Sequence, residues 1–181
     1  MELDLDGNDV NHTGKTLFLE RFIHAEIYRA RPDVMAVIHS HSPAVIPFGV
    51  TKVPMRAMFH NSAFLARGVP TFDIREKFGA TNMLVSNREI GRALAETLGN
   101  HAVALMRGHG DVVVAPTLPL VVFRAVYTEL NARLQAQAVS LGGPIEALSE
   151  EEDLKAEEVN AQIVGRAWEL WKRRVALGKA N

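Results

Sequence analysis

Stretches in which strand-forming apolar residues stand between turn-forming residues predict the strands of this protein. Residues 34–41, VMAVIHSH, form a β-compatible run that ends at a serine-proline pair. Residues 101–115 predict two short strands that are separated at Gly108-His109-Gly110. Two further short strands are predicted at residues 2–8 and 68–74.

Apolar residues at a spacing of three and four predict the helices. These helices are expected at residues 17–30, 89–99, 117–141 and 149–177. Thr16 is the expected N-cap of the first helix. Ser86 and Glu89 form a capping-box pattern ahead of the second helix, and Ser149 forms another with Glu152 at the start of the last. The third helix carries an apolar stripe of Phe123, Tyr127, Leu130, Leu134 and Leu141. Strands that alternate with helices in this way predict an α/β fold in which helices cover a sheet.

Composition excludes several classes of protein and of site. A chain of 181 residues is long enough for one domain, residues 1–181, with a substantial core. With 20 basic and 21 acidic residues, the net charge is close to zero and gives no indication of binding to nucleic acid or to a membrane surface. No run approaches the roughly 18 apolar residues of a membrane span, and the acidic N-terminus is unlike a signal sequence, so a cytoplasmic location is expected. Because the chain has no cysteine, disulfides and thiolate metal sites are excluded.

Two histidines one residue apart are the first candidates for chemistry. Side chains at positions i and i+2 of a strand share one face, so His39 and His41 would lie about 6.5–7 Å apart along it. Their ring nitrogens can then converge on one small cation or on one substrate. The alternative is a pair of strand-end histidines that bind backbone groups or water.

His109 is the third candidate, because it follows a strand and lies between two glycines that allow close backbone approach. Three neutral imidazoles can bind a Zn²⁺-like ion and leave one coordination position open, as catalytic sites do. The alternative is a turn residue with an unusual backbone angle. The remaining histidines of helical or polar surroundings are expected to make only surface or local hydrogen bonds: His12, His24 and His101.

The stretch LERFIHAEIYRARPDVMAVIHSHS, followed by LMRGHGDVVV, resembles the class II aldolase/adducin family. The resemblance covers nearly the whole chain and implies a three-layer α/β/α fold with a central mixed, largely antiparallel sheet. It also implies that His39, His41 and His109 hold one divalent metal ion per chain, with Zn²⁺ expected and Mn²⁺ or another divalent ion as the alternatives. Glu20, nineteen positions before the first of these ligands, matches the catalytic acid of the family. The alternative is a first-turn helix glutamate that the helix dipole favours.

Two departures from the family refine this interpretation. Phe18 and Leu19 stand where the sugar-phosphate aldolases of the family carry a pair of serines that bind phosphate. The stretches LMRGHGDVVV and VFRAVYTELNARLQAQAVSLGG are instead similar to the branch that decarboxylates hydroxylated aromatic or pyridine carboxylates. Family members carry several dozen further residues ahead of ELDLDGN, so the chain is expected to lack N-terminal elements of the fold.

The expected function is therefore that of a metal-dependent carbon–carbon lyase acting on a small molecule. Decarboxylation through a metal-stabilised, enolate-like intermediate is favoured, and a class II aldolase that cleaves a small hydroxy-carbonyl compound would share this chemistry. A non-catalytic, adducin-like interaction module is the third alternative. The resemblance also implies a homotetramer with active sites between subunits.

Three further residues are weaker candidates. His60, in the irregular segment 52–75, is either a substrate contact or a structural residue. Tyr127 is a candidate hydrogen-bond donor to the substrate, although membership of the apolar stripe is the favoured alternative. Arg107, if it points outward, would pair across a subunit interface.

Overall fold

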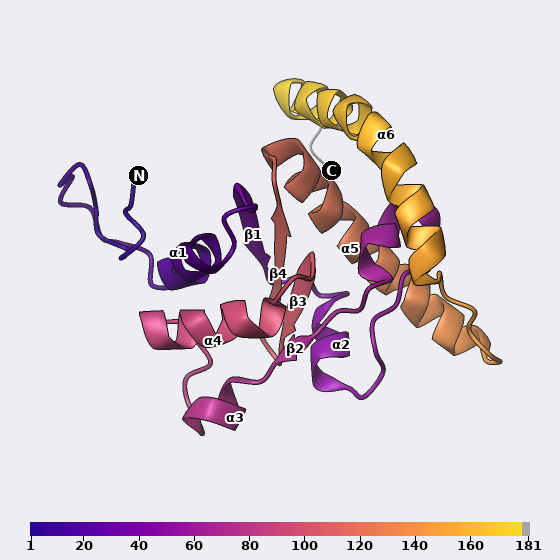
Figure 1. Cartoon of the computed structure of the whole chain (residues 1–181), viewed down its shortest axis with the longest axis horizontal. Helices are drawn as coiled ribbons and strands as arrows, with labels where there is room; N and C mark the ends of the chain where they lie inside the picture. Colours follow the sequence, from indigo (N-terminus) through magenta and orange to yellow (C-terminus); the bar gives the residue numbers. More distant parts are fainter. Residues whose placement is uncertain (179–181) are drawn as a thin grey trace.

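Helices cover both faces of a four-stranded sheet in the computed structural model of the chain, which describes residues 1–178 (Figure 1). The elements in chain order are α1 (Arg21–Ala30), β1 (Ala36–Ser40), α2 (Ile46–Val50), the 3₁₀ helix η1 (His60–Leu65), β2 (Thr71–Phe72), α3 (Ile74–Phe78), α4 (Arg88–Leu98), β3 (Val103–Met106), β4 (Gly110–Ala115), α5 (Leu118–Leu141) and α6 (Glu150–Ala176). Helices α1 and α4 lie on one side of the sheet, and α2, α5 and α6 lie on the other. The predicted three-layer α/β/α architecture is therefore confirmed.

The sheet has the strand order β1-β4-β3-β2. Strand β4 pairs antiparallel with β1 and with β3, whereas β2 runs parallel to β3. The sheet is therefore mixed and largely antiparallel, as predicted. Its central strand β4 connects the strand that carries His39 to the turn that carries His109.

Two hydrophobic cores lie on opposite faces of this sheet. Successive side chains of β4 alternate between them, so that Val112 and Val114 face α1 and α4. Val113 and Ala115 face α2, η1 and α5. Because both faces are covered, every residue of β3 and β4 is buried.

The predicted strand at residues 2–8 is wrong, because the segment forms only an isolated bridge between Leu3 and Asp9. The Asp4 carboxylate accepts hydrogen bonds from the backbone N–H groups of Asp6 and Asn8. Such local side-chain bonds offer the backbone an alternative to strand pairing. The predicted strand at residues 68–74 shortens to the two residues of β2, whereas the two strands within residues 101–115 are confirmed.

The first helix is shorter than the predicted range 17–30. It begins only after Glu20, which occupies the N-cap position in place of Thr16. Phe18 and Leu19 are 51% and 47% exposed, so they lack the buried contacts that stabilise a short amphipathic helix. Glu20 therefore lies at the helix entrance rather than in its first turn.

Helix α5 has the predicted length, and the Thr117 side chain caps it by accepting a hydrogen bond from the Leu120 N–H. The predicted apolar stripe is only partly buried, because Leu141 at its end is 87% exposed. The buried residues of this helix include two amide side chains, those of Asn131 and Gln135. Asn131 and Gln135 bind backbone groups of residues 54–58, and these bonds hold that irregular segment against the helix.

The last helix carries the predicted capping box between Ser149 and Glu152. At the start of α4, however, Asn87 rather than Ser86 is the N-cap, and its side chain accepts a hydrogen bond from the Ile90 N–H at 3.0 Å. Among the helices of residues 1–178, none is long and apolar enough to cross a membrane.

The cap of α4 gives a direct test of this local structure. Asn87→Ala should lower the free energy of unfolding by about 1 kcal/mol, because the Ile90 N–H loses its acceptor. Ser86→Ala is the matched control and should change stability by much less. Urea unfolding of both variants measures the difference, and equal losses would show that Asn87 is not the cap.

Candidate metal centre

Four side chains that the sequence singles out lie together at one edge of the sheet. His39 is on β1, His41 follows the end of that strand, and His109 lies in the turn between β3 and β4. Glu20 precedes α1. One nitrogen or oxygen atom of each residue lies within 4.8 Å of the corresponding atoms of the other three. The structure thus brings together residues that are up to 89 positions apart (109 − 20).

The close approach of two strands brings His109 to the other histidines. Gly110 lies against the end of β1, where a Cβ atom would overlap the carbonyl oxygen of Ser40. Gly108 has φ +64°, a backbone conformation that glycine adopts without strain. The two glycines that flank His109 therefore allow the tight turn and its close contact with β1, and this turn places His109 beside His41.

Hydrogen bonds to the backbone fix the protonation of two of the rings. His39 Nδ1 lies 3.0 Å from the Asp111 carbonyl oxygen, and His109 Nδ1 lies 3.1 Å from the Met83 carbonyl oxygen. A carbonyl oxygen only accepts hydrogen bonds, so both Nδ1 atoms carry a proton. In the neutral rings, both Nε2 atoms then carry a lone pair.

The free nitrogens converge on one point. His41 Nε2 lies 3.0 Å from Nε2 of His39 and 3.0 Å from Nε2 of His109. Glu20 Oε2 lies 3.4 Å from Nε2 of His109 and 3.7 Å from Nε2 of His39. When all three rings are neutral, only His41 can direct an N–H toward the centre of the cluster. The other atoms that face this centre, Nε2 of His39, Nε2 of His109 and Oε2 of Glu20, are all acceptors. The cluster therefore has more lone pairs than protons, and a cation would balance it.

The spacing of the nitrogens suits a metal ion. Zinc–nitrogen bonds of about 2.0–2.1 Å in a tetrahedral arrangement correspond to nitrogen–nitrogen separations of about 3.3 Å. The observed separations of 3.0 Å lie close to this value. Three imidazoles and a nearby carboxylate are also the donor types that Zn²⁺ and Mn²⁺ accept. The residues present thus fit a divalent ion.

The electrostatics keep at least one ring in its metal-binding form. Burial, together with the neighbouring His109 and His41, lowers the pKa of His39, although the Asp111 carbonyl and Glu20 act in the opposite direction. A lower pKa favours the neutral imidazole near pH 7, and the neutral imidazole is the form that binds metals.

The second oxygen of Glu20 is occupied by the backbone. Glu20 Oε1 accepts a hydrogen bond from the Val85 N–H at 2.9 Å, whereas Oε2 faces the histidines. The carboxylate is therefore held in one orientation, with a single oxygen directed toward the cluster.

Two hydrogen-bonded pairs of polar side chains involve the residues that follow His39 and His41, and sequence reasoning missed both pairs. Asp111 is 2% exposed and accepts a hydrogen bond from the Ser40 hydroxyl at 2.6 Å. Burial, with the charge of Glu129, raises the pKa of Asp111 to about 6, although the Ser40 bond opposes this shift. Ser42, directly after His41, donates to the Glu129 carboxylate. The available signal was the aspartate that opens the apolar strand DVVV.

Two of the three weaker candidates, His60 and Tyr127, make their contacts elsewhere. His60 is exposed at the start of η1, and its carbonyl oxygen accepts a hydrogen bond from the Asn160 amide on α6. The Tyr127 ring packs 4.4 Å from the Phe123 ring and 5.9 Å from the Phe59 ring, centroid to centroid. Neither belongs to the four-residue cluster, so their contact with a substrate stays a prediction.

Arg107 already has a partner within its own chain. Its Nε lies 2.9 Å from Asp73 Oδ1. The hydrogen bond from Arg75 and the guanidinium of Arg107 hold the pKa of Asp73 far below its usual range. This ion pair joins the end of β3 to the residue after β2, and pairing of Arg107 across a subunit interface stays a prediction.

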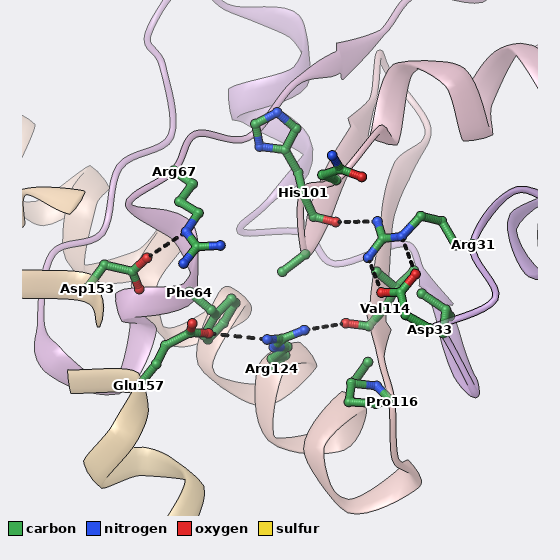
Figure 2. A pocket seen from close by; sticks show the side chains of 14 residues that line it. Arg31, Asp33, Phe64, Arg67, His101, Val114, Pro116, Arg124, Asp153 and Glu157 are labelled. Atoms are coloured by element: carbon green, nitrogen blue, oxygen red, sulfur yellow. Dashed lines mark hydrogen bonds and ion pairs between the residues drawn. The ribbon is translucent and has the colours of Figure 1, made fainter. Parts of the chain in front are cut away.

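A polar cavity of about 190 Å³ lies apart from the four clustered residues (Figure 2). Its charges are internally paired: Arg67 lies 3.4 Å from Asp153, and Arg124 lies 3.2 Å from Glu157. Burial, with the charge of Glu157, raises the pKa of the Asp153 carboxyl to about 6. None of the four clustered residues lines this cavity, and these two ion pairs connect α6 to the rest of the chain.

Comparisons with known proteins find a matching family model and several relatives. The model of the family "Class II Aldolase and Adducin N-terminal domain" matches residues 1–136. Decarboxylase tropJ of Talaromyces stipitatus is 36% identical over 194 residues, which cover 96% of this chain and 73% of the relative. The 3,4-dihydroxyphthalate decarboxylase of Arthrobacter keyseri is 29% identical over 155 residues, which cover 81% of this chain and 60% of the relative.

A solved structure supports the fold. The aldolase II superfamily protein from Pseudomonas syringae superimposes with a TM-score of 0.74 at 24% identity. The superposition covers 98% of this chain and 71% of that protein. The chain thus spans roughly 60–75% of the lengths of these three proteins.

Proposed function

Because the chain belongs to the class II aldolase/adducin family, we propose that it is a metal-dependent carbon–carbon lyase that decarboxylates a hydroxylated aromatic or pyridine carboxylate. His39, His41 and His109 would hold one divalent ion per chain, and Glu20 would be the catalytic acid. Zn²⁺ is the proposed metal, with Mn²⁺ as the alternative. The decarboxylase names of two relatives support the reaction type.

One observation carries the proposal. Two imidazole nitrogens and one carboxylate oxygen, all acceptors, surround the Nε2 atom of His41 at the edge of the sheet. Hydrogen bonds to backbone carbonyls commit the Nδ1 atoms of His39 and His109, so neither ring can reduce the excess of lone pairs by a change of tautomer. A surplus of fixed lone pairs is the arrangement that binds a cation.

The chemistry follows from what each group can do. A bound divalent ion would supply Lewis-acid stabilisation of the electron pair that remains on carbon when the carbon–carbon bond breaks. Glu20 would return a proton to that carbon, because its Oε2 faces the cluster while the Val85 N–H holds its Oε1. The apolar residues 18 and 19, which directly precede this acid, would flank a flat ring.

The aldolase alternative remains open because the family model is named for class II aldolases and because aldol cleavage also leaves an electron pair on carbon. The non-catalytic, adducin-like alternative is less well supported, since Glu20 and all three histidines are present and clustered. A single domain over residues 1–181, a homotetramer and a cytoplasmic location stay predictions.

The role of Glu20 can be separated from that of the metal ligands. Glu20→Gln keeps the size of the side chain and an acceptor for the Val85 N–H, but it cannot transfer a proton. The variant should retain its metal and lose about 10²–10⁴-fold in turnover, measured as CO₂ release. Glu89→Gln, at an exposed position of α4, is the matched control and should match the unsubstituted protein. Undiminished turnover would remove Glu20 from the mechanism, whereas loss of metal would make it a ligand.

The substrate class can be tested by calorimetry on the metal-loaded protein. An aromatic acid with adjacent hydroxyl and carboxylate groups should bind, because the metal would take the charged edge and the apolar residues would face the ring. A para-hydroxy acid, which cannot chelate, should bind far more weakly. Sugar phosphates should release no heat, since Phe18 and Leu19 offer no donor to a dianion. Tight binding of a ketose phosphate, with no heat from the ortho-hydroxy acid, would instead favour the aldolase.

A further inference from the structure

One loop contacts two of the four residues of the proposed site. The segment 81–85 lies between α3 and α4. Its Met83 carbonyl oxygen lies 3.1 Å from His109 Nδ1, and its Val85 N–H donates to Glu20 Oε1 at 2.9 Å. The proposed ligand and the proposed acid are therefore both bound to the backbone of the same five residues.

The backbone of this segment is unusual at its centre. Met83 has φ +70°, and His12 is the other non-glycine residue with positive φ in residues 1–178. Left-handed backbone is disfavoured for residues other than glycine, asparagine and aspartate. Local hydrogen bonds hold it here: the Thr81 hydroxyl accepts from the Met83 N–H at 2.9 Å, and the Asn82 side chain accepts from the Leu84 N–H at 3.1 Å.

This conformation determines where the two polar groups of the loop point. The Met83 carbonyl and the Val85 N–H belong to successive peptide planes on either side of Leu84. A change of the Met83 dihedral angles would redirect the carbonyl away from His109 and shift the N–H that holds Glu20. A strained residue next to polar groups of a site is a recognised device for orienting them.

We propose that segment 81–85 is a positioning element that fixes the acid Glu20 relative to the ligand His109, and that the left-handed backbone of Met83 is its essential feature. The inference rests on the proposed metal-dependent function. The Met83 carbonyl keeps the proton of His109 on Nδ1, which leaves Nε2 free for the metal. The Val85 N–H holds one oxygen of Glu20, so that the other faces the same point.

The side chain of Met83 needs its own control, because it packs over the turn that carries His109. Its terminal methyl lies 3.1 Å from the position that a Cβ on Gly108 would occupy. Leucine and isoleucine have similar size and hydrophobicity, but only isoleucine is β-branched and therefore strongly disfavoured at positive φ. Met83→Ile and Met83→Leu thus differ mainly in the backbone conformation that they permit. Met83→Asn adds a residue that accepts the left-handed region.

The test is a titration of the metal-free proteins with Co²⁺, followed by the visible absorption of the bound ion. Met83→Ile should weaken Co²⁺ binding by about 10–100-fold, the usual effect of losing a residue that orients a ligand, and should change the absorption bands. Met83→Leu and Met83→Asn should stay within about threefold of the unsubstituted protein. Equal affinity and spectra for all four proteins would overturn the inference, while the metal centre itself would stand.

Two further results complete the test. If the unsubstituted protein binds no Co²⁺, the proposed metal centre fails and the inference fails with it. A second measurement needs no variant and therefore does not depend on whether Met83→Ile folds. Long-range ¹H–¹⁵N NMR of the metal-free protein should show His109 protonated on Nδ1, and protonation on Nε2 instead would overturn the role of the Met83 carbonyl.

Discussion

The hydrogen bonds from two imidazole rings to backbone carbonyls are the constraint on which the whole site depends. Asp111 holds the ring of His39, and Met83 holds the ring of His109. Each bond determines which nitrogen of its ring is free and where that nitrogen points. The site is therefore built by the backbone of the fold, and its geometry does not rest on side-chain rotamers alone.

Two close backbone approaches bring these groups within reach of one another. At Gly110, the β3–β4 turn meets the end of β1 without room for a side chain, and His109 thereby joins the other histidines. At Gly91, helix α4 packs so closely on α1 that a Cβ atom would overlap the carbonyl group of Phe22. The second approach fixes the start of α1 over the sheet and with it Glu20. Glycine is needed at both places for lack of space.

The sequence predicts this site better than it predicts the elements that support it. The spacing of His39 and His41 and the glycines around His109 follow from strand geometry and from turn chemistry, and both act over a few residues. Only the family resemblance identifies Glu20 as a site residue. No local sequence pattern links a residue that precedes a helix to His39, nineteen positions further along the chain. Val85, the partner of Glu20, could not be found at all, since a backbone N–H leaves no trace in the sequence.

Several of the errors in the fold have a common physical origin. At Asp4 and at Asn87, a polar side chain bonds to nearby backbone and so moves the boundary of an element or prevents it from forming. In α5, Asn131 and Gln135 are buried because their amides bind an irregular segment whose path is a tertiary property. Hydrophobic periodicity detects the helix but cannot tell which of its polar residues have such partners.

The metal content of the purified protein tests the central claim most directly. After dialysis against metal-free buffer, elemental analysis should find about one divalent ion per chain, and His39→Ala or His109→Ala should remove most of it. His101→Ala, which alters a histidine outside the cluster, is the matched control and should keep the ion. Unchanged metal content in the His39→Ala and His109→Ala variants would contradict the account, because the converging imidazoles would then not be the ligands.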